Sequence, residues 1–132
     1  MLQTSKGDDV TSRPVADLLV SLAEPTRLRI VNCLSVAPLF VSDLSAILDL
    51  PDATIAEHLD TLATEGIVRT SPVVPYLIYT LAPLPGMRER LLRSVLDTVR
   101  SDTAAPNDRA AALDRSRLRF ETRVRGAAMN AS

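Results

Sequence analysis

The sequence is short of the side chains that bind transition metals, form disulfides or stack on bases. Its 132 residues hold one cysteine, Cys33, one histidine, His58, two tyrosines, two phenylalanines and no tryptophan. A single cysteine cannot form an internal disulfide, and one cysteine with one histidine does not complete a zinc site. So few aromatic side chains argue against a stacking platform for single-stranded RNA. The composition therefore predicts no metal site, and nothing in the sequence indicates a cofactor.

Long apolar runs are also absent. Apolar residues make up 46% of the chain, but no run approaches the ~18 residues of a membrane span. The first residues, MLQTSKGDDVTSRP, are polar and acidic at Asp8 and Asp9, unlike a secretion signal. We therefore expect a cytoplasmic protein without membrane contact. A chain of this length buries one modest core, so we expect one domain with tails.

The formal net charge of −1 hides an uneven distribution. Residues 40–66 contain six acidic residues and no lysine or arginine, whereas residues 84–125 contain ten arginines against six acidic residues. The chain therefore has an acidic middle and a basic C-terminal part. Arginine suits bidentate pairing with carboxylate or phosphate better than lysine does.

The apolar spacing predicts four helices in the first half of the chain. The first carries an apolar face around Leu18, and the second begins with Pro25 in its first turn. Ser42 is expected to cap a short third helix, and a tight turn at residues 49–51 leads into PDATIAEHLDTLATEGIV, residues 51–68. Apolar residues recur there at helical spacing until a glycine ends the helix. Two short helices joined by a tight turn form a helix-turn-helix.

After this helix the pattern changes from helical to extended. IVRTSP and YLIYTL, joined by VVP, predict a two-stranded hairpin, and a helix with a broad apolar stripe follows it. The polar SDTAAPN indicates a linker before a last, arginine-rich helix. We expect a disordered tail over residues 1–12, a domain over 13–100, a linker over 101–107, and a helix with a tail over 108–132.

Three segments together resemble the ArsR-type family of winged-helix transcriptional repressors: LAEPTRLRIVNCL (22–34), LSAILDLPDATIAEHLDTLATEGIV (44–68) and the YLIYTL strand. The resemblance covers roughly residues 15–100. It implies a mainly α fold with a two-stranded β wing, a winged helix-turn-helix, to which this chain adds a C-terminal helix. It also implies a homodimer that places two recognition helices in successive major grooves of double-stranded DNA and releases the DNA when an effector binds.

The dimer that the resemblance implies forms between the first helix and the helix after the wing. The broad apolar stripe of the second of these helices fits such a contact, because a domain of about 100 residues has little core left to cover it. The expected dimer interface consists of Leu18, Leu19, Leu22, Leu91, Leu92, Val95 and Val99.

The chain departs from the metal-sensing members of this family. Such members typically carry a cysteine pair in the first helix of the helix-turn-helix, where LFVSDL places Phe40 and Ser42. Others carry Asp and His pairs on the helix after the wing, which here offers Asp97 without a histidine. Cys33 lies on the inward face of an apolar helix, which indicates a buried, unreactive thiol. We therefore predict that the protein does not sense metals.

The predicted recognition helix is acidic where such a helix meets DNA. Helical geometry places Glu57, Asp60 and Thr64 opposite its buried stripe. Carboxylates repel phosphates, and the base-edge role open to them is to accept a hydrogen bond from cytosine N4. The expected DNA-binding residues are Asp52, Thr54, Ala56, Glu57, His58, Asp60, Arg27 and Arg69.

Three interpretations remain open. In the first, the chain is a DNA-binding repressor in which Arg27, Arg29 and Arg69, with the basic C-terminal part, outweigh the acidic helix. In the second, the same dimer uses its acidic surface to bind a basic protein partner, or its own arginine-rich last helix. In the third, it is an enzyme fragment, because similar domains precede the catalytic domains of small-molecule methyltransferases. We predict the first, and no enzyme, since the chain holds no glycine-rich cofactor loop and no acid–base pair.

Overall fold

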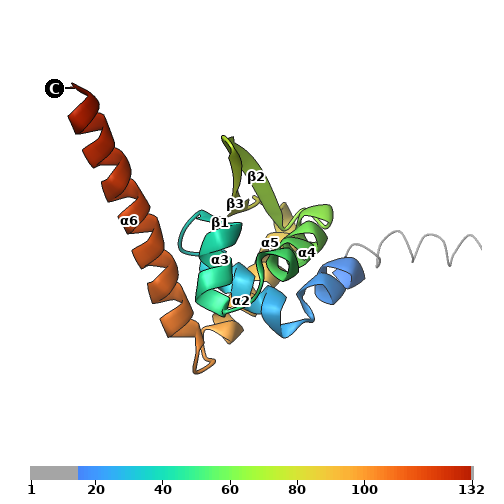
Figure 1. Ribbon diagram of the computed structural model, residues 1–132. Helices are drawn as coiled ribbons and strands as arrows, with labels where there is room; N and C mark the ends of the chain where they lie inside the picture. The colour runs from blue at the N-terminus through green and yellow to red at the C-terminus, as the bar shows by residue number, and fades with distance from the viewer. Residues whose placement is uncertain (1–14, 132) are drawn as a thin grey trace, which may run out of the picture.

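The computed structural model describes residues 15–131, with side chains through Arg119 and at Glu121. The expected tail over residues 1–12 lies outside the described residues. A helix over residues 15–22 opens the fold (Figure 1). It is followed by α2 Pro25–Leu34, β1 Leu39–Phe40, α3 Val41–Leu48, α4 Asp52–Thr64, β2 Val68–Val73, β3 Tyr76–Leu81, α5 Gly86–Val99 and α6 Ala105–Ala131.

The ends of the short helices are fixed by local contacts. Glu24 caps α2 by accepting a hydrogen bond from the Arg27 amide at 2.8 Å, with Pro25 at the first helical position. The expectation that Ser42 caps α3 is wrong, because the helix already begins at Val41. The Asp43 carboxylate instead accepts the backbone N–H of Phe40, the N-cap residue, at 2.8 Å.

Two residues in left-handed backbone conformation separate the central elements. Asp49 ends α3 with a φ of 56°, and Gly66 follows α4 with a φ of 78°. Glycine adopts this conformation without steric cost, and aspartate tolerates it better than most residues. The predicted helix-turn-helix and its glycine stop are therefore present as α3, the turn and α4.

The hairpin predicted after α4 is confirmed, and the sheet has one strand more than expected. Strands β2 and β3 pair antiparallel from Val68↔Leu81 to Val73↔Tyr76, and they project from the body as a wing (Figure 1). The short β1 pairs with the other edge of β3, giving the order β1-β3-β2. We expected only the end of a helix at APLF, because a two-residue strand is visible only once its partner is in place.

One hydrophobic core lies between the helices and the base of the wing. Its largest fully buried apolar side chains come from the first helix, α2, β1, α3, α4 and the residue just before β2, and they are Leu18, Ile30, Val31, Leu39, Leu44, Ile55, Leu59, Leu62 and Ile67. Both helices of the helix-turn-helix thus pack on the same core. Replacing any one of these buried leucines or isoleucines by alanine is expected to lower the free energy of unfolding by about 2–5 kcal/mol.

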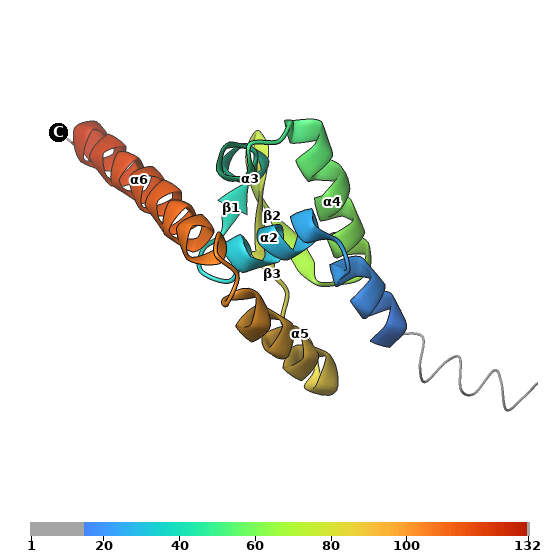
Figure 2. The ribbon, with the colours of Figure 1, turned by 90° about the horizontal axis from the view of Figure 1, so that it is seen from below.

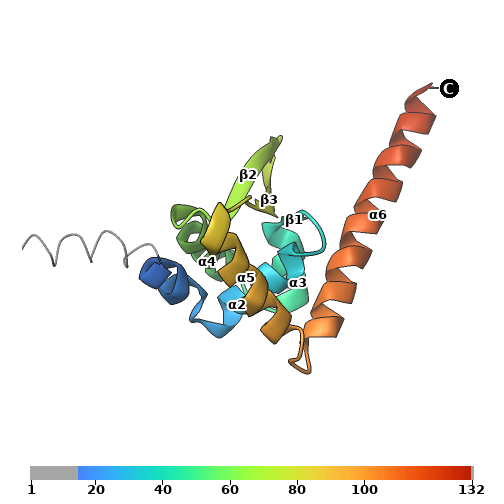
Figure 3. The same ribbon diagram turned by 180° about the vertical axis from the view of Figure 1, so that it is seen from behind.

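Helix α6 begins three residues earlier than expected and packs on the domain. Its first residue, Ala105, lies inside the stretch interpreted as a linker, because Pro106 fits the first helical turn, where its missing N–H costs nothing. The first half of α6 contacts α2 and α3, and the helix then runs beyond the body (Figure 3). Buried Ala105 and Ala112 lie on its inner face, whereas Leu113 is about half exposed.

Candidate nucleic-acid interface

Helix α4 has one buried face and one exposed face. Ile55, Leu59 and Leu62 are fully buried on the core side. On the other side, Asp52, Glu57 and Asp60 are exposed, as expected from the sequence, while Thr54, Ala56 and His58 are intermediate in exposure. The helix stands at the outside of the body below the wing (Figure 1). Of the predicted α4 residues, the three acidic ones therefore lie on the solvent-exposed side of the helix, and the other three are partly covered.

The six acidic residues of the middle segment differ in their surroundings. Asp43 is buried and paired with Arg115 and Arg119, and Glu65 is paired with Arg88 at 2.8 Å. Asp49, Asp52, Glu57 and Asp60 are exposed, and within the described part of the chain their carboxylates form no ion pair or hydrogen bond. Four of the six charges therefore remain available to a partner.

Arg27 and His58 form a junction between α2 and α4. Arg27 Nη1 lies 3.3 Å from His58 Nδ1, and its Nε donates to the carbonyl of Ser21. The Glu24 carboxylate lies 3.8 Å from the same imidazole nitrogen. These contacts tie α4 to the end of the first helix, so Arg27 and His58 both have an internal structural role.

The other two expected cations have opposite surroundings. Arg29 donates two hydrogen bonds to Asp108 of α6, at 2.9 and 3.1 Å, which also raise the pKa of the guanidinium. Arg69 is exposed on β2 and has no ion pair among the residues described. Of the arginines expected to offset the acidic helix, Arg69 is the one left open to solvent on the wing.

A shallow hollow of about 300 Å³ lies between the start of α3, the start of α4 and the tip of the wing. Ser42 and Asp52 line its polar side, and Phe40 and Tyr76 line its apolar side. The two rings lie edge to face, with their centroids 6.2 Å apart. Val74 at the wing tip is 90% exposed. The sequence reasoning missed Tyr76, although a residue directly after a predicted hairpin turn is expected at the wing tip.

The expected dimer interface is largely used inside the single chain. Leu18, Leu22, Leu92 and Val99 are buried, and Leu91 and Val95 pack partly buried against the core. Packing of α5 on α2 covers part of its broad apolar stripe. Leu19, together with its neighbours Val15 and Val20 and the distant Met87, stays exposed.

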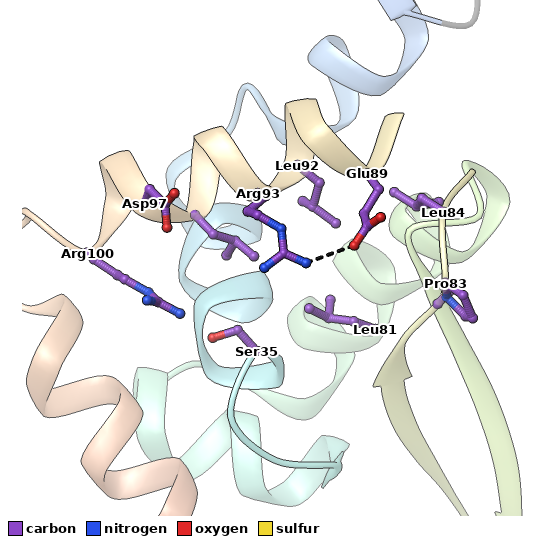
Figure 4. Close-up of a pocket in the computed structure, with 11 residues that line it drawn as sticks. Ser35, Leu81, Pro83, Leu84, Glu89, Leu92, Arg93, Asp97 and Arg100 are labelled. Carbon is purple, nitrogen blue, oxygen red and sulfur yellow. Dashed lines mark hydrogen bonds and ion pairs between the residues drawn. The ribbon is translucent and has the colours of Figure 1, made fainter. Parts of the chain in front are cut away.

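A second hollow, of about 380 Å³, lies beneath α5 (Figure 4). Leu81 and Leu92 line its base, and Arg93 pairs with Glu89 at 2.8 Å on its rim. Charges of both signs therefore surround it. Across the described residues, no group of three or more His, Cys, Asp and Glu side chains is placed to hold a metal ion.

Cys33 is fully buried, as the sequence predicts. Its Sγ lies 3.9 Å from the carbonyl oxygen of Asp108 on α6. Burial away from water raises the pKa of the thiol to about 12. The thiolate, which is the reactive form, is therefore disfavoured at neutral pH.

None of the helices over the described range is long and apolar enough to cross a membrane. No curated protein matches the chain. Among solved structures, reduced HlyU from Vibrio cholerae N16961 matches with a TM-score of 0.59 and 24% identity, over 76% of this chain and 95% of that one.

Two further structures are similar. The transcriptional regulator HlyU from Vibrio vulnificus CMCP6 has a TM-score of 0.57 and 26% identity, over 74% of this chain and 96% of its own. The transcriptional repressor BigR from Xylella fastidiosa has a TM-score of 0.60 and 22% identity, over 76% of this chain and 99% of its own. These structures share the winged helix-turn-helix fold formed by α3, α4 and the β2–β3 hairpin.

The sequence match falls on the helix-turn-helix itself. Residues 24–70 match the family described as "Bacterial regulatory protein, arsR family", a segment that begins at the cap of α2 and ends within β2. Over this segment, which is about a third of its length, the chain is therefore similar to the arsR family of bacterial regulatory proteins.

Proposed function

We propose that the protein is a homodimeric transcriptional repressor of the cytoplasm that binds double-stranded DNA with α4 in the major groove and the β2–β3 wing beside it. The observation that carries the proposal is α4, whose apolar face is locked into the core while its other face is accessible over its whole length. The second helix of a helix-turn-helix contacts base edges in this way. The family match over residues 24–70 supports the same assignment.

The acidic face of α4 sets the kind of contact that it makes. Glu57 and Asp60 accept hydrogen bonds and repel phosphates, so the base edge that suits them is the amino group of cytosine. Arg69, exposed on the wing, supplies a phosphate contact. Arg27 and Arg29 stay in their internal contacts and contribute only to the long-range field.

The dimer uses the apolar side chains that the single chain leaves exposed on the first helix. Val15, Leu19 and Val20 are between 41% and 68% exposed there. Leu19→Asp with Val20→Asp is expected to give a folded monomer in sedimentation, with Val74→Asp at the wing tip as the control. Sedimentation of the unaltered chain as a stable monomer would contradict the dimer. Leu92 is unsuited to this test, because it is buried within the chain.

The regulatory signal does not involve a bound transition metal. Phe40 and Ser42 stand at the positions that resemble a cysteine pair in metal-sensing members, and neither is a transition-metal ligand. Elemental analysis after dialysis is expected to find no stoichiometric metal. One zinc per chain would contradict this part of the proposal.

Fluorescence anisotropy with duplexes taken from upstream of the protein's own gene tests DNA binding directly. We expect saturable binding that weakens as salt rises, and tighter binding to one duplex than to a scrambled duplex of the same composition. Equal binding to both duplexes would contradict sequence-specific recognition of an operator. No binding to either at low salt would overturn the proposal and favour the basic protein partner.

A further inference from the structure

We propose that α6 is a strap that holds the helix-turn-helix in its DNA-binding arrangement, and that Arg115 and Arg119 act on DNA affinity as positioning residues through Asp43. This role rests on the proposed function above. The Asp43 side chain is 5% exposed, and each of its oxygens meets a different arginine of α6. Arg115 Nε donates to Oδ1 at 2.9 Å, and Arg119 Nη1 donates to Oδ2.

The same carboxylate fixes the first turn of α3. Its Oδ2 also accepts a hydrogen bond, at 2.8 Å, from the backbone N–H of Phe40, and Phe40 is the N-cap residue of α3. One buried side chain thus joins the start of α3 to α6. Because a buried carboxylate that loses its partners is strongly unfavourable, α3 and α6 are held as a unit.

Arg119 also contacts the segment before α3. Its Nη2 donates to the Pro38 carbonyl at 3.1 Å, and its guanidinium lies 4.8 Å from the centre of the Phe40 ring. A cation over an aromatic face adds an attraction that lysine matches less well. The loop that leads from α2 into α3 is therefore fixed by the same residue that pairs with Asp43.

The other end of the strap is anchored on α2. Asp108 accepts both hydrogen bonds from Arg29, Asn32 donates to the Ala105 carbonyl at 3.2 Å, and Arg109 donates to Asn32 Oδ1 at 3.1 Å. Helix α6 thus bridges α2 and α3, on the side of the body opposite α4 (Figure 2). It leaves the recognition surface uncovered.

This bridge fixes the orientation of the recognition helix. Helix α4 follows α3 through a tight turn and packs against it, so a shift of α3 moves α4 relative to the wing. By holding α3 in place before DNA binds, the strap reduces the conformational entropy that α3 and α4 lose on binding. Loosening the strap is therefore expected to weaken DNA binding even in a chain that stays folded.

Asp43→Asn separates this effect from simple electrostatics, and Asp49→Asn is its matched control, because Asp49 is exposed at the end of α3 and asparagine tolerates its left-handed backbone. Both substitutions remove one negative charge, which by itself strengthens attraction to phosphates. We expect Asp49→Asn to bind DNA as tightly as the wild type or more tightly, and Asp43→Asn to bind about tenfold more weakly. Anisotropy is measured at a temperature where circular dichroism shows both variants folded. Equal or tighter binding by folded Asp43→Asn would overturn the proposal.

Hydrogen exchange gives a readout that does not need DNA. Arg115→Gln with Arg119→Gln leaves α3 itself unaltered, and we expect faster amide exchange over residues 38–48 than in Arg117→Gln, whose arginine pairs with exposed Asp114. Unchanged exchange would overturn the strap. Faster exchange with unchanged DNA affinity would show a purely structural contact and overturn the positioning role. A wild type that binds no duplex overturns the proposed function and this role together, whereas normal wild-type binding with unaffected variants overturns this role alone.

Discussion

The exposed face of α4 and the inner face of α6 both carry ionised side chains, but they use them in opposite ways. On α4, the carboxylates of Asp52, Glu57 and Asp60 point to solvent without a partner among the described residues. On α6, Arg115 and Arg119 surround a buried carboxylate of α3. The exposed carboxylates of α4 contribute little to stability and can interact with a partner. The arginines of α6 instead neutralise a buried carboxylate and so hold α6 against α3.

Stability should separate these two regions most strongly. We expect Asp43→Ala to lower the free energy of unfolding by about 2–3 kcal/mol, because it removes a helix cap and leaves two arginines without their carboxylate. Asp60→Ala, on the exposed face of α4, should change it by less than about 0.5 kcal/mol. Urea denaturation of the two variants measures the difference. Similar values for both would mean that burial of Asp43 contributes nothing.

Reversing the charge of the α4 face tests its availability to DNA. Glu57→Arg with Asp60→Lys removes repulsion and adds attraction, so affinity for any duplex should rise more than tenfold if even ~1.4 kcal/mol of net attraction results. The gain should be largest at low salt, where screening is weakest. Loss of a tight operator complex in this variant would instead identify Glu57 or Asp60 as a base-reading acceptor.

Two arginines allow the same comparison for cations. Arg69→Gln should weaken DNA binding and lower the salt dependence by about one phosphate contact per chain, because Arg69 is exposed on the wing. Arg29→Gln should leave the salt dependence unchanged and lower stability, because Arg29 is bound to Asp108. Titrations at several salt concentrations, with denaturation of both variants, check the pair of outcomes. Equal salt slopes in the two variants would refute the distinction.

An effect confined to alkaline pH is expected at the joint between α2 and α6, where burial raises the pKa of the Cys33 thiol from 9.0 to about 12. The folded protein therefore keeps this proton at pH values where the unfolded chain loses it. The stability that Cys33 contributes is complete below pH 9 and is lost as the pH rises from about 9 towards 12. The difference in urea midpoint between wild type and Cys33→Ala, followed with pH, should shrink over this interval. A constant difference would mean that the thiol titrates normally.

Local patterns were sufficient to predict most elements of the fold. The start of α2 follows from Glu24 and Pro25, and α4 follows from apolar residues at helical spacing before Gly66. The two-stranded wing follows from alternation of β-branched and aromatic residues. The start of α6 at Ala105 was predicted too late, because proline marks both a linker and the first turn of a helix. Caps, periodicity and turns depend on residues close in the chain, which is why they can be read from it.

Such local patterns could not predict which charged side chains are buried in ion pairs and which are exposed. Asp43 and Asp49 are six residues apart in one acidic segment, yet Asp43 is buried between arginines and Asp49 is exposed. The same holds for the dimer residues, of which Leu18 is buried within the chain and its neighbour Leu19 is 44% exposed. Adjacent residues on a helix differ in this way because burial depends on which other element packs against each face.

The sequence by itself determined that this chain has a helix-turn-helix with a wing, an acidic second helix and an arginine-rich end. Only the tertiary structure decided that Arg115 pairs with Asp43, 72 residues away in the chain, while Arg69 remains unpaired among the described residues. The physical reason is that propensity, capping and hydrophobic periodicity act over one or two turns of the chain. An ion pair depends on distance in space, and that distance is set only when α6 docks on α2 and α3.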